Sequence, residues 1–263
     1  MRIVWLVLAL LAGDAAWGRE CVRGKPCGNT CIAQDRVCRI DGGSTSTQPG
    51  SPRPSSTQPS SLPVPARPGA PRTFREAKNV GPQIYAGHEV ELYCGCAYSG
   101  NRVDWDSFGY APRKNPARAA RIEWEHIVPA WWFGHQLQCW QEGGRAQCTA
   151  SPEFNVMEAD LRNLYPAIGE VNGDRRNFAH GMVSGVPPQY GQCETVTDFK
   201  ARTTMPRPEV RGLIARTWFY MRDTYGLRLS RQDTQVFEAW DRQYPPTEWE
   251  RERERRIMSL QGR

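Results

Sequence analysis

The sequence predicts a mixed α+β domain, and two kinds of apolar pattern lead to this prediction. The middle of the chain contains short strand-like segments bounded by turn residues, whereas the last third repeats apolar residues at helical spacing. The 263 residues suit one domain of ordinary size with extensions. A net charge of +6 and a pI near 8.9 favour polyanionic partners, although many soluble basic proteins share such values.

The first residues have the pattern of an export signal. Arg2 precedes an apolar run from Ile3 to Ala12, and Gly13-Asp-Ala-Ala-Trp-Gly18, which includes small residues suited to a cleavage site, follows. Because this run is too short to cross a bilayer, we expect a signal peptide over residues 1–18, cleaved after Gly18 or alternatively after Ala15. No other segment is apolar enough to span a membrane, so we expect a periplasmic or secreted protein.

Two extensions follow the signal before the domain begins at residue 73. Residues 19–41 hold four of the nine cysteines in a segment too small to bury a core, and we expect two disulfides there, with a zinc site as the less favoured alternative. These cysteines are Cys21, Cys27, Cys31 and Cys38. Residues 42–72 contain eight prolines and no acidic residue, which predicts a disordered tether.

The domain, residues 73–263, starts with an expected helix from Thr73 to Ile84. Alternation of apolar residues then predicts four strands, Glu89–Tyr98, Arg102–Trp105, Ala120–Val128 and Leu161–Tyr165. Pro166 suits the first turn of a helix from Ala167 to Phe178, which would turn Asn172 inward, although Gly173 weakens the helical pattern.

The last third predicts three helices with apolar residues on one face of each. The first begins at Pro208 and ends at Gly226, the second begins at Ser230, and the third begins near Thr247. We interpret the aromatic residues of these helices as core rather than as surfaces for stacking on bases.

The adjacent residues Glu125 and His126 are the strongest chemical signal in the chain. Glutamate is an oxygen ligand for Mg²⁺ or Ca²⁺, and neutral imidazole accepts protons near neutral pH. Neighbouring strand residues point to opposite faces, so both can serve one site only if the backbone bends there, and Pro129 is a plausible end to the strand. A second polar cluster follows between Asp160 and Asn177.

These motifs together resemble the endonuclease I family of periplasmic and secreted nucleases. The resemblance rests on Glu123-Trp-Glu125-His126-Ile-Val-Pro-Ala130, then Asn163-Leu-Tyr-Pro166, then Gly169-Glu-Val-Asn172-Gly173. It extends from about Phe74 to Gly262 and includes Tyr93-Cys-Gly-Cys96, Arg113-Lys-Asn115, Gly212-Leu-Ile-Ala-Arg-Thr217 and Glu248-Trp-Glu250. It implies a ββα-metal nuclease core with additional helices.

The resemblance also implies a set of site residues. His126 would be the general base for water, Glu125 and Asn172 would hold one Mg²⁺ (with Ca²⁺ or Mn²⁺ as alternatives), and Arg145 would steady the cleaved phosphate. Weaker supporting candidates are Asn163, Glu170 and Asn177, of which Asn163 competes with Asn172 as the metal ligand.

This reading implies an endonuclease without sequence specificity. Its expected products are 5′-phosphate and 3′-hydroxyl ends, its expected substrate is double-stranded DNA with RNA as a second candidate, and its expected state is a monomer.

Two other classes of function stay open at this point. One is a catalytically silent protein for nucleic-acid binding or uptake, which would not need the intact set of polar residues. The other is a zinc hydrolase, which the spacing of the four histidines disfavours; we interpret His135 and His180 as structural.

The domain has an odd number of cysteines, Cys94, Cys96, Cys139, Cys148 and Cys193. Many endonuclease I sequences have cysteines where this chain has Phe108 and Arg251, so the family pairing does not transfer completely. We expect a bridge from Cys139 to Cys148 across a loop and one from Cys193 to Cys94 or Cys96, with one thiol left over.

Overall fold

The computed structural model describes residues 25–27, 30–32 and 69–262. The first two ranges form an antiparallel pair, β1 (Lys25–Cys27) with β2 (Thr30–Ile32), in which Lys25 faces Ile32. The expected signal peptide and the tether up to residue 68 lie outside the described residues. The expected disulfides among the four N-terminal cysteines depend on side chains that are likewise not described.

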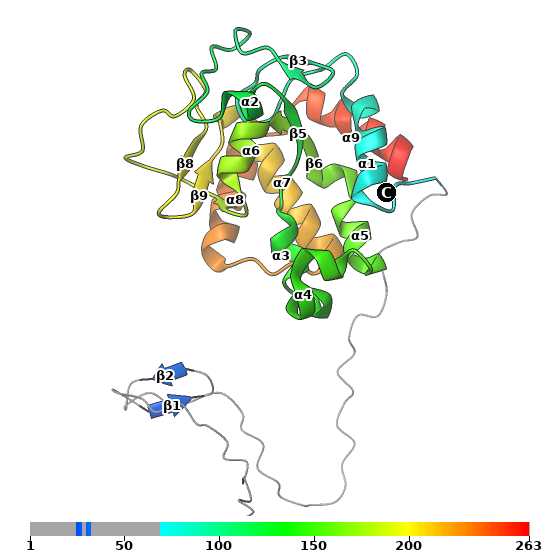
Figure 1. The fold of residues 1–263 in the computed structure, drawn as a ribbon, viewed down its shortest axis with the longest axis vertical. Coiled ribbons are helices and arrows are strands. Elements are labelled where there is room, and N and C mark those ends of the chain that lie inside the picture. Colours follow the sequence, from blue (N-terminus) through cyan, green and yellow to red (C-terminus); the bar gives the residue numbers. More distant parts are fainter. Residues whose placement is uncertain (1–24, 28–29, 33–68, 263) are drawn as a thin grey trace, which may run out of the picture. The chain divides into compact units, whose positions relative to one another are not determined.

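A pair of antiparallel strands lies at the centre of residues 69–262. Strand β5 (Ile122–His126) pairs with β6 (Leu164–Ile168) in a register that sets His126 opposite Leu164. Helix α6 (Gly169–Arg175) follows β6 without a loop and contacts both strands. Every residue of β6 is buried, because helices cover the pair (Figure 1). The order is therefore strand, strand, helix.

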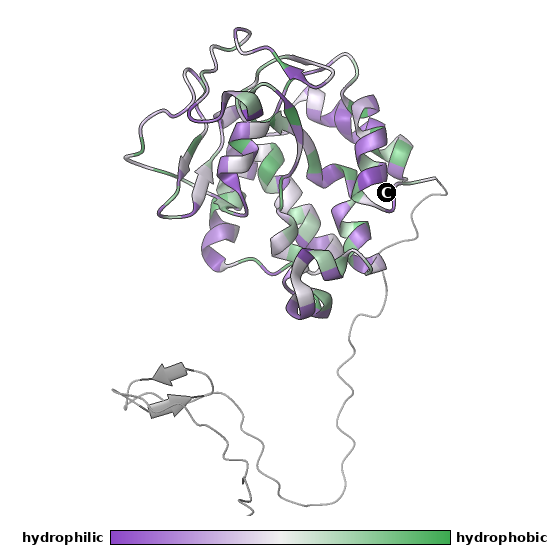
Figure 2. Cartoon of the chain, viewed as in Figure 1, coloured by the Kyte–Doolittle hydropathy of each residue, from purple (hydrophilic) through white to green (hydrophobic). Residues whose placement is uncertain are grey.

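Four longer helices surround this centre. They are α1 (Phe74–Tyr85), α7 (Pro208–Tyr225), α8 (Arg231–Gln243) and α9 (Glu248–Gln261). Helix α1 lies beside α9, and α7 contacts α8 (Figure 1). Figure 2 shows hydrophilic and hydrophobic residues alternating along these helices, as amphipathic helices require. The mixed α+β class is confirmed.

The starts of these helices agree with the sequence patterns. Hydroxyl groups of Thr73, Ser230 and Thr247 accept the backbone N–H three residues on, in α1, α8 and α9 respectively. Gly226 ends α7 in a left-handed conformation, with φ 68°.

Shorter elements complete the described domain. One short helix precedes β5 in the sequence, α2 (Pro116–Ala119). Three follow between β5 and β6, namely α3 (Ala130–Gly134), α4 (Gln138–Cys148) and α5 (Pro152–Glu158). A hairpin pairs β3 (Tyr98–Ser99) with β4 (Arg102–Val103), and a small sheet has the order β7 (Ala179–His180), β9 (Thr203–Met205), β8 (Val196–Asp198). Among the described residues, no helix is both long and apolar enough to cross a membrane.

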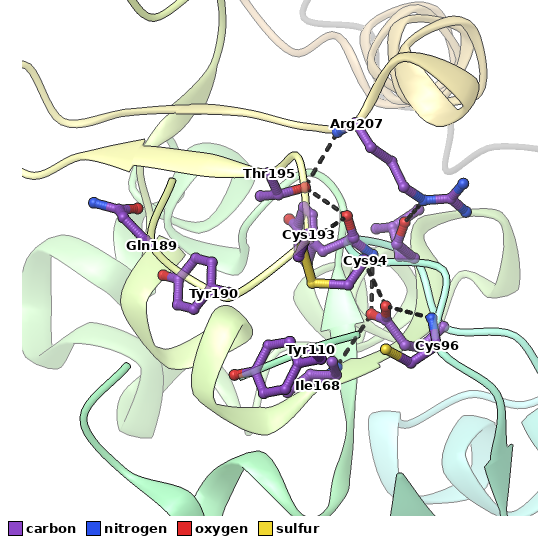
Figure 3. Close-up of a disulfide and its surroundings, with 12 residues drawn as sticks. Cys94, Cys96, Tyr110, Ile168, Gln189, Tyr190, Cys193, Thr195 and Arg207 are labelled. Carbon is purple, nitrogen blue, oxygen red and sulfur yellow. Dashed lines mark hydrogen bonds between the residues drawn. A yellow bond between two sulfur atoms is a disulfide. The ribbon is translucent and has the colours of Figure 1, made fainter. Parts of the chain in front are cut away.

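The prediction of one strand from Glu89 to Tyr98 is wrong. The buried carboxylate of Glu91 accepts hydrogen bonds from the backbone N–H groups of Tyr93, Cys94 and Cys96, and these bonds hold a turn instead. Figure 3 shows this cluster, in which the same carboxylate also reaches the N–H of Ile168 in β6. A side chain that satisfies backbone donors locally competes with strand pairing.

Two further segments differ from their predictions. Residues 161–163 form a 3₁₀ turn (Leu161–Asn163), and the strand starts only at Leu164, so Pro166 lies inside β6 opposite Trp124 rather than in a helix. A proline is tolerated in this two-stranded pair because its missing N–H can face outward from the ladder. The segment Cys139–Cys148 is helical, with a kink at Gly143 and Gly144, and not a loop.

Two disulfides lie within residues 69–262. Cys139 is bonded to Cys148 across α4, and Cys94 is bonded to Cys193, 99 residues away in the sequence. Cys96 is the free cysteine of this region, and it is buried (Figure 3). The longer bridge attaches the Glu91 turn to the segment before β8.

Candidate active site

A polar cavity lies beside the C-terminal ends of β5 and α6. Its volume is about 390 Å³. Five of the residues singled out from the sequence line it, namely Glu125, His126, Arg145, Asn172 and Asn177. These come from β5, α4, α6 and the loop after α6, so the fold gathers residues that lie up to 52 positions apart in the sequence (177 minus 125).

Glu125 is buried and held by two neighbours. The hydroxyl of Tyr93 donates to its Oε1 at 2.5 Å, and a guanidinium nitrogen of Arg175 lies 3.0 Å from the same oxygen. Burial is the largest influence on this carboxyl and raises its pKa, while the charge of Arg175 acts in the opposite direction. Because both contacts end on Oε1, Oε2 is the oxygen without either of these partners.

His126 follows Glu125 and is also buried. Its Nε2 lies 2.8 Å from the backbone carbonyl oxygen of Glu158, and a carbonyl can only accept, so Nε2 bears the proton of the neutral ring. The lone pair of the neutral ring is then on Nδ1. Burial, the largest effect, lowers the pKa of His126 to about 3, and the positive charges of Arg145 and Arg175 act in the same direction.

Asn172 lies on α6, one turn before the helix ends. Its Nδ2 is 3.4 Å from Oε2 of Glu123, a carboxylate that also forms a two-bond pair with Arg118. Since the amide nitrogen points to Glu123, the amide oxygen is the atom left to contact a ligand in the cavity.

Arginines surround the cavity. Arg118, Arg145, Arg175 and Arg176 all line it. Arg145 is half-exposed and pairs with the buried carboxylate of Glu158, with Nε 2.7 Å from Oε1. The four positive charges of this wall therefore outnumber the negative charge of its one lining carboxylate, Glu125. This excess favours an anionic ligand.

Arg175 is the buried member of this group, with a side chain only 1% exposed. Besides Glu125, it donates to the carbonyl oxygens of His126 and Ile127, so it joins the end of β5 to α6. Among the described residues, its Nε is the buried side-chain N or O atom without a hydrogen-bond partner. Sequence reasoning gave Arg175 no role, although it lies inside the polar cluster that the motifs marked.

The structure places the remaining candidates elsewhere. Asn163 does not line the cavity; it is fully buried, accepts from the N–H of Val128 at 2.7 Å and donates to the carbonyl of the same residue at 2.9 Å. Glu170 accepts from the N–H groups of Arg113, Lys114 and Asn115 and so anchors that loop. Although burial opposes the shift, these bonds hold the pKa of Glu170 below its usual value.

The cavity offers oxygen ligands but no three-residue metal cluster. Within residues 25–27, 30–32 and 69–262, no group of three His, Cys, Asp or Glu side chains is arranged to hold a metal ion. One carboxylate and one amide oxygen nevertheless fit Mg²⁺, which keeps several waters and needs few protein ligands. The donor set does not fit zinc, which prefers imidazole and thiolate.

The other histidines have different surroundings. His180 is buried, accepts at Nδ1 from the indole N–H of Trp218 at 3.1 Å, and lies 3.0 Å from the hydroxyl of Tyr93. His88 stacks on Trp249 outside the cavity. His135 stacks on Trp131, a residue of the cavity wall.

The structure thus combines an α+β domain with one cavity that holds a carboxylate, a neutral imidazole and surrounding arginines, an arrangement suited to acid–base chemistry on an anionic ligand. Residues 75–263 match the profile of the Endonuclease I family. The chain therefore belongs to the endonuclease I family.

Three relatives illustrate this membership. A periplasmic deoxyribonuclease of Aeromonas hydrophila is 57% identical over 196 residues, which cover 73% of this chain and 83% of the relative. Endonuclease-1 of Buchnera aphidicola subsp. Acyrthosiphon pisum (strain APS) is 44% identical over 198 residues, 72% of this chain and 77% of the relative. An extracellular endonuclease of Pseudomonas fluorescens biotype A is 40% identical over 210 residues, 76% of this chain and 88% of the relative.

Proposed function

We propose that this protein is an exported, metal-dependent endonuclease that hydrolyses DNA without sequence specificity and leaves 5′-phosphate and 3′-hydroxyl ends. The observation that supports this most is the cavity in which Glu125, His126, Arg145 and Asn172 meet. Family membership and relatives named as periplasmic and extracellular deoxyribonucleases support the reaction class and the location.

His126 is the proposed general base. Its Nε2–H is committed to the carbonyl of Glu158, which fixes the ring and leaves Nδ1 to take a proton from the attacking water. The lowered pKa keeps the imidazole neutral at physiological pH, so this base is ready without prior deprotonation.

The arginines are the proposed counter-charges. The attack places additional negative charge on the phosphate, and a planar guanidinium binds two phosphate oxygens at once. Arg145 is suited to this because half of its side chain is exposed and its partner Glu158 holds only one edge of the fork. Arg175 is too buried to bind a backbone phosphate and is proposed to hold Glu125 and the end of β5 instead.

Glu125 and Asn172 are the proposed ligands of one divalent cation, most simply Mg²⁺. Such an ion supplies positive charge to the phosphate and to the departing oxygen. The contacts of Glu125 with Tyr93 and Arg175 orient its carboxylate toward the cavity before any ion arrives. Asn177 is proposed to support the site from the cavity wall, and Asn163 through its two hydrogen bonds to Val128, two residues after β5.

A plasmid-cleavage assay tests the proposal. Wild type should cleave with Mg²⁺ and stop with EDTA, and His126→Ala should lose about 100- to 10,000-fold in rate, the usual contribution of a general base. His88→Ala is the matched control, because His88 lies outside the cavity. Full cleavage by His126→Ala would contradict the role of His126 as general base. A wild-type protein that binds DNA but does not cleave it with any metal tested would indicate a binding or uptake protein.

A further inference from the structure

Trp131 differs from the other tryptophans of this domain in being exposed. It is the second residue of α3, it is 39% exposed, and it lines the cavity that contains Glu125 and His126. The other large exposed apolar residues of the described chain, Phe108, Met182, Phe199 and Met258, do not line that cavity. Single exposed apolar residues are common on protein surfaces, so what distinguishes Trp131 is its place in the wall of this cavity, beside the candidate catalytic residues.

The indole of Trp131 is held in one orientation. The imidazole of His135 stacks flat against it, with ring centroids 4.1 Å apart and planes 8° apart. His135 is itself fixed by a 2.7 Å hydrogen bond from Nδ1 to the carbonyl oxygen of Trp131. Trp132 meets the indole edge-on at 5.7 Å. One indole face is therefore covered, and these contacts restrict the ring before any ligand binds.

The rest of the cavity wall defines the chemistry of that ligand. Phe74 and Trp140 add aromatic surface, and the three lining arginines that are not buried, Arg118, Arg145 and Arg176, add positive charge. Aromatic faces combined with guanidinium groups bind single-stranded nucleic acid, because bases stack on the rings while phosphates contact the arginines. The cavity volume of about 390 Å³ lies in the usual range for a site that takes a small group.

We infer that Trp131, braced by His135, forms a nucleobase subsite that stacks on the base next to the cleaved phosphate. A base inside a duplex is already stacked on its neighbours, so this subsite selects nucleotides that are single-stranded or locally unpaired. The inference rests on the proposed nuclease function, because it places the base and the cleaved phosphate on one strand.

The test measures binding of a short single-stranded oligonucleotide that contains 2-aminopurine, using the full chain in EDTA so that nothing is cleaved. Stacking on Trp131 should quench the 2-aminopurine fluorescence of the wild-type complex. Trp131→Ala should abolish this quenching and weaken binding about 5- to 150-fold, which corresponds to one base stack. Trp131→Phe should retain most of both, which separates stacking from a loss of folding.

His135→Ala and His88→Ala form a matched pair, since each removes a histidine stacked on a tryptophan and only the first stack belongs to the cavity. The first should weaken the quenching and the second should not. Unchanged affinity and quenching in Trp131→Ala, or no binding by wild type, overturns the inference.

Plasmid cleavage by wild type with Mg²⁺ keeps the two proposals separate. If the plasmid is cleaved while Trp131→Ala binds the oligonucleotide like wild type, only the subsite fails. If the plasmid is not cleaved under any metal, the nuclease function fails, and the inference fails with it.

Discussion

The hydroxyl of Tyr93 lies between the proposed metal ligand and a buried histidine, and its removal gives the sharpest test of the site. Trp218 donates to Nδ1 of His180, so the neutral ring bears its proton on Nε2 and donates it to Tyr93. The hydroxyl hydrogen is then free to be donated to Glu125 at 2.5 Å. Tyr93→Phe removes this oxygen and preserves the ring.

The structure sets the size of the effect. The lost bond ends on a buried carboxylate, and hydrogen bonds to charged groups contribute about 1.5–3 kcal/mol. Arg175 still contacts Glu125, so the carboxylate stays paired but loses one of the two contacts that orient it. Residues that orient a metal ligand typically change metal affinity about 10- to 100-fold. We expect Tyr93→Phe to lose about 2 kcal/mol of stability and to need about 10- to 100-fold more Mg²⁺ for half-maximal cleavage.

Two measurements check this prediction, plasmid cleavage over a Mg²⁺ titration and calorimetric Mg²⁺ binding without DNA. Tyr190→Phe is the matched control, because the hydroxyl of Tyr190 also donates to a carboxylate, that of Asp174, at 2.8 Å. The control should lose stability without a change in Mg²⁺ requirement. An unchanged Mg²⁺ midpoint in Tyr93→Phe, with stability lost, would reduce the hydroxyl to a structural role and refute the reasoning.

Three more predictions follow from burial. Asn172→Ala should cut plasmid cleavage at least 10-fold with little change in the urea-unfolding midpoint. Asn163→Ala should instead cost about 2–4 kcal/mol of stability, because it leaves the N–H and carbonyl of Val128 without their side-chain partner. The reverse pattern would contradict the placement of the two amides. Burial lowers the pKa of His126 to about 3, so the folded protein takes up this proton at lower pH than the unfolded chain. The stability that neutral His126 contributes is therefore complete above about pH 6.5 and falls by about 1.4 kcal/mol per pH unit toward pH 3. Burial also lowers the pKa of His180, so His126→Gln should reduce, rather than abolish, the slope of stability against pH in urea titrations between pH 5 and 7; identical slopes would show that His126 titrates normally. Thiol titration should find about one free thiol after denaturation and none before, because Cys96 is buried and its pKa is raised to about 12; two or more would contradict the pairing.

The sequence predicted the ends of helices better than the ends of strands. Caps are local: the hydroxyl of Thr73 and the freedom of Gly226 act within a few residues, so the pattern contains the answer. The strand expected over Glu89–Tyr98 failed because its competitor was a side chain within the segment itself. Apolar alternation does not show that Glu91 binds three nearby N–H groups.

The candidate site divides in the same way. The residue types of Glu125 and His126 indicated their chemistry, and the resemblance to the endonuclease I family singled out Asn172. Motifs did not distinguish Asn163 from Asn172 by chemistry, since both are asparagines in polar clusters. Tertiary contacts distinguish the two, because the amide of Asn163 is bonded to Val128 whereas Asn172 lines the cavity.

The sequence by itself determined the mixed α+β class, the caps of the main helices and the family, and it supplied the candidate residues for acid–base chemistry. Only the tertiary structure decided that Tyr93 and Arg175 both contact Glu125, that Nδ1 of His126 has the lone pair, and that Trp131 lies open beside them. The physical reason is the distance along the sequence over which each kind of interaction acts. Propensity and capping act over a few residues, whereas burial, proton placement and exposure depend on groups that meet only after the chain has folded.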